Sequence, residues 1–310
     1  MKTIPSPVHF RSLSALHTAM GISAPLHPLI SIIDYGETRF DPKLFESGTK
    51  TDFYKISFKT SFHGKIRYGQ GYYDFENGGM SFVSPGQTLK MDEEEADYSG
   101  MALHIHPDFI RPYPLLKKIK EYSFFSYAAA EALYLSEKEK KTITDVFENI
   151  KNELNERIDV FSQDVIISQI ELLLTYSNRF YNRQFITRKA VNHSLLSKME
   201  DLLNDYFDRE KELKGLPTVE YIASQLSLTP RYLSDMLRHH TGQNAQQHIH
   251  DKLIEKAKEY LCESQFSVSE TAYQLGFEHP QSFSKLFKKK TQLTPNEYRQ
   301  SLQKQNNEYP

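Results

Sequence analysis

The sequence predicts an α+β protein: an N-terminal antiparallel β barrel or sandwich with helices after it, then an all-α domain in which a long helix joins two helix-turn-helix units. Three observations support this prediction. Short apolar stretches between turn residues fill residues 28–110, helical apolar spacing starts at residue 136, and a pattern at 218–238 recurs at 267–288. The 310 residues are enough for two domains with substantial cores.

The N-terminal region shows the pattern of many short strands. Apolar stretches cover residues 29–35, 53–58, 65–73, 80–83 and 98–105. Turn residues separate them, as at Asn77-Gly78-Gly79 and Ser84-Pro85-Gly86. Such punctuation is typical of a small antiparallel barrel or sandwich. Residues 1–25 carry no clear pattern, and where they pack is left open.

Aromatic side chains are dense between residues 53 and 82, and most of them are expected to fill the interior of the β domain. An aromatic-lined cavity with Lys55, Lys59 or Arg67 at its mouth would suit a small anionic or polar ligand. The sequence does not identify the residues that would bind an effector.

Two histidines, His104 and His106, raise the question of a metal site, because alternate residues of a strand share a face. His63 is the only further candidate nearby, and Pro107 follows directly, which favours a structural strand end. No glycine-rich phosphate loop and no nucleophile elbow is present. The sequence therefore predicts no catalytic residue, no metal and no cofactor.

Two helices are predicted after the strands, at residues 136–157 and 165–180. The first has a single apolar stripe, whereas the second is apolar over most of its surface. A helix too apolar for one buried face favours a dimer interface, although packing within the molecule remains an alternative. The polar, basic stretch that follows, 181–194, predicts a linker between domains, placed at residues 183–194.

The second helix-turn-helix unit has the stronger local pattern. Ser267 and Glu270 predict a capping box at its first helix. Gly276 suits the positive φ of a sharp turn, and Pro280 suits the first turn of the next helix, which His279 is expected to cap. Phe283, Leu286 and Phe287 are spaced to face inward.

The opposite face of that helix is polar and basic, as expected of a helix that enters the major groove. Gln281, Ser284 and Lys285 are the expected base contacts. Lys288 and Lys289, in a cluster that also contains Lys290, are the expected phosphate contacts.

The first unit, at 218–238, presents a similar outward set. Arg231 is the expected reader of guanine, with Ser234 and Asp235 as further base contacts and Arg238 as a phosphate contact. Because a carboxylate repels phosphate, Asp235 requires either a cytosine amino group or a basic neighbour. A long helix at 245–262 is predicted to hold the two units at a fixed separation.

Residues 272–299 resemble the signature of the AraC/XylS family of bacterial transcription regulators. The matching residues are Ala272, Leu275-Gly276-Phe277, Phe283-Ser284, Phe287-Lys288-Lys289, Thr294-Pro295 and Tyr298-Arg299. The likeness covers residues 195–303, and Gln292 stands where the family usually has glycine. It implies a cupin-like sensor and dimerisation domain at 1–182, a linker at 183–194 and an AraC-type tandem helix-turn-helix domain at 195–305.

The function implied is that of a sequence-specific DNA-binding transcription regulator that responds to a small molecule. The implied partners are double-stranded promoter DNA, a second copy of the chain, a small-molecule effector and RNA polymerase; the implied location is the bacterial cytoplasm, at the nucleoid, without a membrane. The alternative is a cupin-type metal enzyme fused to a DNA-binding tether. A nucleoid protein that binds DNA without sequence preference fits less well, because such a protein is expected to be basic and this chain has a net charge of -2.

A single cysteine, Cys262, excludes an intramolecular disulfide. Its place at the end of the apolar face of 245–262 predicts a buried thiol.

Overall fold

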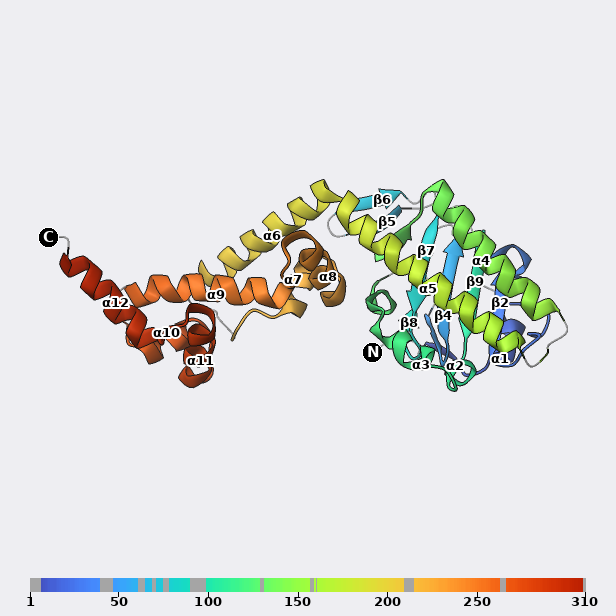
Figure 1. The fold of residues 1–310 in the computed structure, drawn as a ribbon, viewed down its shortest axis with the longest axis horizontal. Coiled ribbons are helices and arrows are strands. Elements are labelled where there is room, and N and C mark those ends of the chain that lie inside the picture. The colour runs from blue at the N-terminus through green and yellow to red at the C-terminus, as the bar shows by residue number, and fades with distance from the viewer. Residues whose placement is uncertain are drawn as a thin grey trace, which may run out of the picture. The chain divides into compact units, whose positions relative to one another are not determined.

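Two units make up the chain, Met1–Thr187 and Arg188–Pro310. The division falls inside the range 183–194 that the sequence assigns to a linker. The computed structural model describes residues 7–39, 47–60, 65–68, 71–74, 78–89, 99–128, 131–156, 159, 161–208, 215–262 and 266–308. The first unit combines strands with helices and the second is helical (Figure 1), so that the predicted mixture of α and β structure is confirmed.

A five-stranded sheet is the centre of the first unit. Its order is β10 (Leu133–Tyr134), β7 (Gly79–Val83), β4 (Tyr54–Lys59), β9 (Gly100–Ile105) and β2 (Ile30–Asp34), and all neighbours are antiparallel. Ile56 and Phe58 of the central strand are fully buried. Strands therefore form where the sequence predicts them at 29–35, 53–58, 80–83 and 98–105; residue 98 itself lies outside the described residues.

A second sheet contains β1 (Val8–Phe10), β3 (Thr49–Thr51) and β8 (Thr88–Leu89). Its β1 and β3 are parallel, which corrects the expectation of a purely antiparallel domain. Parallel neighbours need a crossover connection, and the chain between these strands passes through α1 (Leu13–Ala19) and β2.

The N-terminal segment, whose packing the sequence leaves open, belongs to the core of this unit. Phe10 of β1 and Leu13 and Leu16 of α1 are buried in one cluster with Ile33 of β2 and Phe53. A further antiparallel pair is formed by β5 (Lys65–Tyr68) and β6 (Gly71–Asp74), so the stretch predicted at 65–73 contains two strands; residues 69 and 70 lie outside the described residues.

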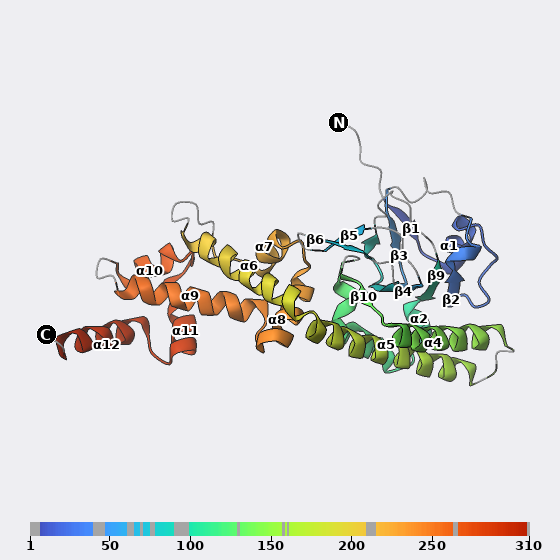
Figure 2. The same cartoon turned by 90° about the horizontal axis from the view of Figure 1, so that it is seen from above.

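Helices cover the five-stranded sheet. The pair α4 (Glu137–Asn155) and α5 (Ser162–Thr187) lie side by side along the strands (Figure 2). Phe147 of α4 packs on Phe58 of β4, with ring centroids 6.0 Å apart. Two shorter helices, α2 (Pro107–Ile110) and α3 (Leu115–Lys118), precede them.

The helix α5 runs past the predicted end at residue 180. Residues 181–187, expected to start the polar linker, are helical because their side chains find partners in the first unit. The Tyr181 hydroxyl donates to the Glu131 carbonyl at 3.2 Å, and Arg183 pairs with Glu139 at 2.8 Å.

In the second unit, α9 (Ala245–Cys262) contacts two pairs of shorter helices. Its bounds are those predicted for the connecting helix. The other helices are α6 (Lys189–Asp208), α7 (Val219–Gln225), α8 (Pro230–Thr241), α10 (Val268–Gln274), α11 (Pro280–Thr291) and α12 (Pro295–Glu308). Within the described ranges, none of the helices has the length and apolarity needed to cross a membrane.

Candidate nucleic-acid interface

The first helix pair, α7 and α8, has both of its helix starts fixed by threonine caps. Thr218 Oγ1 accepts from the Tyr221 amide at 3.1 Å, and Thr229 Oγ1 accepts from the Tyr232 amide at 3.2 Å. Each cap satisfies an amide that has no partner inside the helix. Between the helices, Ser227 takes a left-handed φ of 56°, so that the chain turns sharply without a glycine.

The second pair, α10 and α11, starts with the predicted capping box. Ser267 Oγ accepts from the Glu270 amide at 3.1 Å, and the Glu270 carboxylate accepts from the Ser267 amide at 2.7 Å. The hydrogen bond from the Ser267 amide to the carboxylate, followed by one from the Ser267 side chain, lowers the pKa of Glu270.

The turn between α10 and α11 requires a glycine for two reasons. Gly276 has φ 89°, as predicted. A Cβ at this position would also lie 2.4 Å from the carbonyl oxygen of Gly215. The expectation that His279 caps α11 is wrong: its side chain makes no cap hydrogen bond, because the Ser282 amide donates to the His279 carbonyl instead.

The inward face of α11 is aromatic. Phe283 and Phe287 are fully buried, and the Phe283 ring lies 5.5 Å from that of Phe277 and 5.7 Å from that of Phe287. In α8 the corresponding inward residues, Leu233 and Leu237, are also fully buried. This packing fixes which side of each helix faces solvent.

The outward face of α11 carries the predicted contact residues. Gln281, Lys285, Lys288 and Lys289 are exposed. Ser284 is half-buried, and its hydroxyl donates to the Pro280 carbonyl at 3.0 Å.

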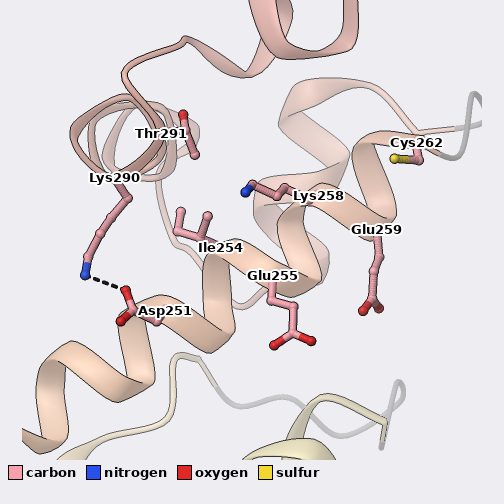
Figure 3. Close-up of a pocket in the computed structure, with 8 residues that line it drawn as sticks. All are labelled: Asp251, Ile254, Glu255, Lys258, Glu259, Cys262, Lys290 and Thr291. Atoms are coloured by element: carbon pink, nitrogen blue, oxygen red, sulfur yellow. Dashed lines mark hydrogen bonds and ion pairs between the residues drawn. The ribbon is translucent and has the colours of Figure 1, made fainter. Parts of the chain in front are cut away.

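The lysine cluster at the end of α11 divides into two parts. Lys290, unlike Lys288 and Lys289, points at α9, where its Nζ lies 2.5 Å from Asp251 Oδ1 (Figure 3). The sequence gives no local signal for this pair, because the two residues are distant along the chain.

The outward face of α8 contains a group of two arginines around one carboxylate. Arg231 and Arg238 keep about half of their side-chain area exposed, whereas that of Asp235 is only 10 % exposed. Asp235 Oδ1 accepts from Arg238 Nη1 at 2.9 Å, and Asp235 Oδ2 lies 3.4 Å from Arg231 Nε. Asp235 therefore has the basic neighbours that its position requires; Ser234 beside it is half-buried.

An open hollow of about 530 Å³ lies between α9 and the end of α11 (Figure 3). Cys262 lies at its edge and is exposed. The expected burial of this thiol is thus wrong, because the apolar face of α9 ends at Leu261, which is 1 % exposed.

The α11 helix ends in a left-handed residue. Gln292 has φ 65°, and the corresponding end of α8 is Gly242 with φ 80°. Gln292 thus performs the glycine's conformational role, at a cost of about 1 kcal/mol.

His104 and His106, the histidines considered for a metal site, do not form a pair. His106 caps α2, where its Nδ1 accepts from the Asp108 amide at 3.2 Å. His104 is 3 % exposed, and burial, followed by the charge of Lys55, holds its pKa well below the usual value. His63 lies outside the described residues, and no three potential metal ligands are grouped among the residues that are described.

Comparison with known proteins identifies the C-terminal region. Residues 222–301 match the family model described as a helix-turn-helix domain. The transcriptional activator RhaS of Salmonella arizonae is 29% identical over 141 residues, which is 46% of this chain and 46% of that protein. The match therefore spans about half the length of the curated relatives.

Two solved structures are each similar to about a third of this chain. The C-terminal domain of the two-component response regulator yesN from Fusobacterium nucleatum is 32% identical, over 32% of this chain and 96% of that chain, with a TM-score of 0.29. The DNA-binding domain of AdpA in complex with a target DNA is 21% identical, over 34% of this chain and 94% of that chain, with a TM-score of 0.31.

Proposed function

We propose that the protein is a sequence-specific DNA-binding transcription regulator of the AraC type, a proposal supported by the match of residues 222–301 to a helix-turn-helix family model and by the similarity to RhaS. The observation that supports this most directly is the sorting of side chains on α8 and α11. Each helix buries its apolar face and exposes arginine, lysine or glutamine on the other, which are the groups that hydrogen-bond to base edges and phosphates.

The connecting helix supports a tandem arrangement of two readers. α9 contacts both helix pairs, and its 18 residues correspond to a length of about 27 Å. Successive major grooves on one face of DNA are about 34 Å apart. We assign base contacts to Arg231, Ser234, Gln281, Ser284 and Lys285, and phosphate contacts to Arg238, Lys288 and Lys289.

Asp235 takes a different role in this proposal from the one expected of it. Its carboxylate is nearly buried and already accepts from Arg238, with Arg231 close by. An acceptor held beneath two guanidinium groups limits their rotation, so that less entropy is lost when they bind DNA. We therefore assign Asp235 to the positioning of both arginines rather than to a base.

Replacement of Arg231 by alanine is expected to cost about 1–3 kcal/mol at the preferred site and to relax the choice of one base pair, because a bidentate contact to guanine is lost. Competitive binding to a site library measures both effects. Asp235→Asn is expected to weaken the preference at the same base pair less strongly. An equal loss on random DNA would contradict the base-reading role of Arg231.

Replacement of Lys288 by alanine is expected to weaken binding to all sequences alike. Loss of one phosphate contact should flatten the slope of log K against log[salt] by about one unit. The matched control is Lys290→Ala, since Lys290 is bound to Asp251 and should leave the slope unchanged. Similar slopes for the Lys288 variant and the unaltered protein would exclude the contact.

For the first unit we propose a cupin-like sensor that is also the dimerisation domain. Four apolar side chains in and just before α5 are exposed: Phe161 by 67%, Val165 by 42%, Leu172 by 41% and Ile186 by 56%. The exposed side chains of the neighbouring α4, among them Lys141, Glu148 and Asn149, are polar. An exposed apolar stripe beside a polar helix is typical of a surface that a second copy covers.

Substitution of Leu172 by aspartate is therefore expected to produce a monomer, because dimerisation would bury an unpaired charge. Sedimentation equilibrium measures the change. Asn149→Asp adds the same charge on the exposed face of α4 and should leave the dimer intact. A dimer that survives Leu172→Asp, or an unaltered protein that is monomeric at micromolar concentration, would refute this interface.

A further inference from the structure

Two rows of cross-strand neighbours place polar side chains on one face of the five-stranded sheet. Lys55 of β4 pairs in register with His104 of β9 and with Val83 of β7. One step along, Ser57 of β4 pairs with Ser81 of β7. Directly paired residues share a face with Cβ atoms about 5 Å apart, so that Lys55, Ser57 and Ser81 form one continuous patch.

This patch lines a partly enclosed cavity of about 50 Å³ in the first unit. Gln87 contributes a further polar group, and Phe124 and Tyr181 form part of the aromatic wall, with rings stacked at 5.4 Å. By volume the cavity has room for about four waters. It is therefore suited to a ligand of a few non-hydrogen atoms.

Hydrogen-bond donors dominate the polar end of the cavity. The Gln87 Oε1 already accepts from the Ser84 amide at 2.9 Å, so that its NH₂ group is the part left to bind a ligand. The Lys55 ammonium lies 5.7 Å from the centre of the Tyr35 ring. No carboxylate lines the cavity, and within the described part of the chain none pairs with Lys55.

The Lys55 ammonium is the charge that makes this end of the cavity electropositive. Its cross-strand neighbour His104 is 3 % exposed, and among the described residues its Nδ1 has no hydrogen-bond partner; with its lowered pKa the ring is neutral and adds no negative charge. Burial of an ammonium is costly unless it is paired, and among the described residues no carboxylate pairs with the half-buried Lys55; an anion with acceptor oxygens offsets that cost. The other end is aromatic, and it provides few hydrogen-bond donors for the oxygens of a tetrahedral anion such as phosphate.

We infer that the first unit binds a small organic carboxylate in this cavity, with the carboxylate at Lys55, Ser81 and Gln87 and a short apolar tail against the aromatic wall. The inference rests on the proposed regulator function, for which it names the chemical class of the effector. Lys55 is one of the cations that the sequence analysis places at an aromatic cavity; the side chain of Arg67, another of them, lies outside the described residues.

The test is isothermal titration calorimetry on the full chain with acetate, propionate and butyrate, with propionamide and 1-butanol as neutral counterparts and inorganic phosphate as a second anion. At least one carboxylate is expected to bind. Lys55→Gln should weaken that binding about 10- to 100-fold, as expected for one charge-assisted hydrogen bond. Lys59→Gln, on the same strand but outside the cavity lining, is the matched control and should bind normally.

A second variant, Ser81→Val, removes a hydrogen-bond donor without removing charge. It keeps the inference testable if the Lys55→Gln variant does not fold. The inference is overturned if no carboxylate binds, if the neutral compounds or phosphate bind as tightly, or if both variants bind like the unaltered protein. DNA binding by the unaltered protein, measured in parallel with and without the carboxylates, separates the two proposals. If the protein binds no DNA under either condition, the regulator function is refuted. If it binds DNA but no carboxylate, only the effector class is refuted.

Discussion

Replacement of Phe283 by alanine is expected to destabilise the second unit by about 3–5 kcal/mol, since a fully buried phenylalanine leaves a large cavity. Phe283 contacts the rings of both Phe277 and Phe287. Its loss therefore removes the packing that holds α11 against the turn. Chemical denaturation followed by circular dichroism measures the change.

The matched control for Phe283→Ala is Tyr273→Ala on α10. The Tyr273 side chain is 58% exposed, so that its removal should change stability by less than about 0.5 kcal/mol. DNA affinity at a temperature where Phe283→Ala remains folded should also fall, because the outward face of α11 loses its fixed orientation. Equal stability of the two variants would contradict the packing described for α11.

Replacement of Gly276 by alanine is expected to cost about 3 kcal/mol, the sum of a left-handed backbone and a steric clash. The new Cβ would lie 2.4 Å from a backbone oxygen of Gly215, which cannot move away as a side chain can. The Gly215 carbonyl is further fixed by the Tyr206 hydroxyl, which donates to it at 3.0 Å.

Gly242→Ala measures the cost of a left-handed backbone without a steric clash. Gly242 has φ 80°, but an added Cβ would meet nothing within 4 Å. The expected cost is about 1 kcal/mol. The difference between the two alanine variants in denaturant titration measures the clash, and equal costs would show that Gly276 is needed for its φ alone.

Local patterns predicted the second unit well because its elements are determined by residues close in sequence. The capping box of Ser267 and Glu270, the positive φ of Gly276 and the bounds of α9 each depend on spacing within one helix or turn. The apolar spacing of α11 likewise predicted which face Phe283 and Phe287 bury.

Contacts between distant segments were not predictable in the same way. The pairs of Lys290 with Asp251 and of Arg183 with Glu139 join residues on different helices, and the parallel pairing of β1 with β3 depends on a crossover. Asp235 was predicted as a base contact that requires either a cytosine amino group or a basic neighbour, and spacing alone does not show which of the two it finds. The side-chain geometry supplies the basic neighbours, because the carboxylate lies between two arginines.

The central proposal is that α8 and α11 of one chain enter two adjacent major grooves. Hydroxyl-radical and methylation-interference footprinting on a selected site, with the Arg231→Ala and Lys285→Ala variants, tests it most directly. We predict two protected major-groove segments on one face of the duplex, about 10 base pairs apart, with each variant losing interference in a different segment. A single protected segment, or the loss of the same guanines in both variants, would contradict the account.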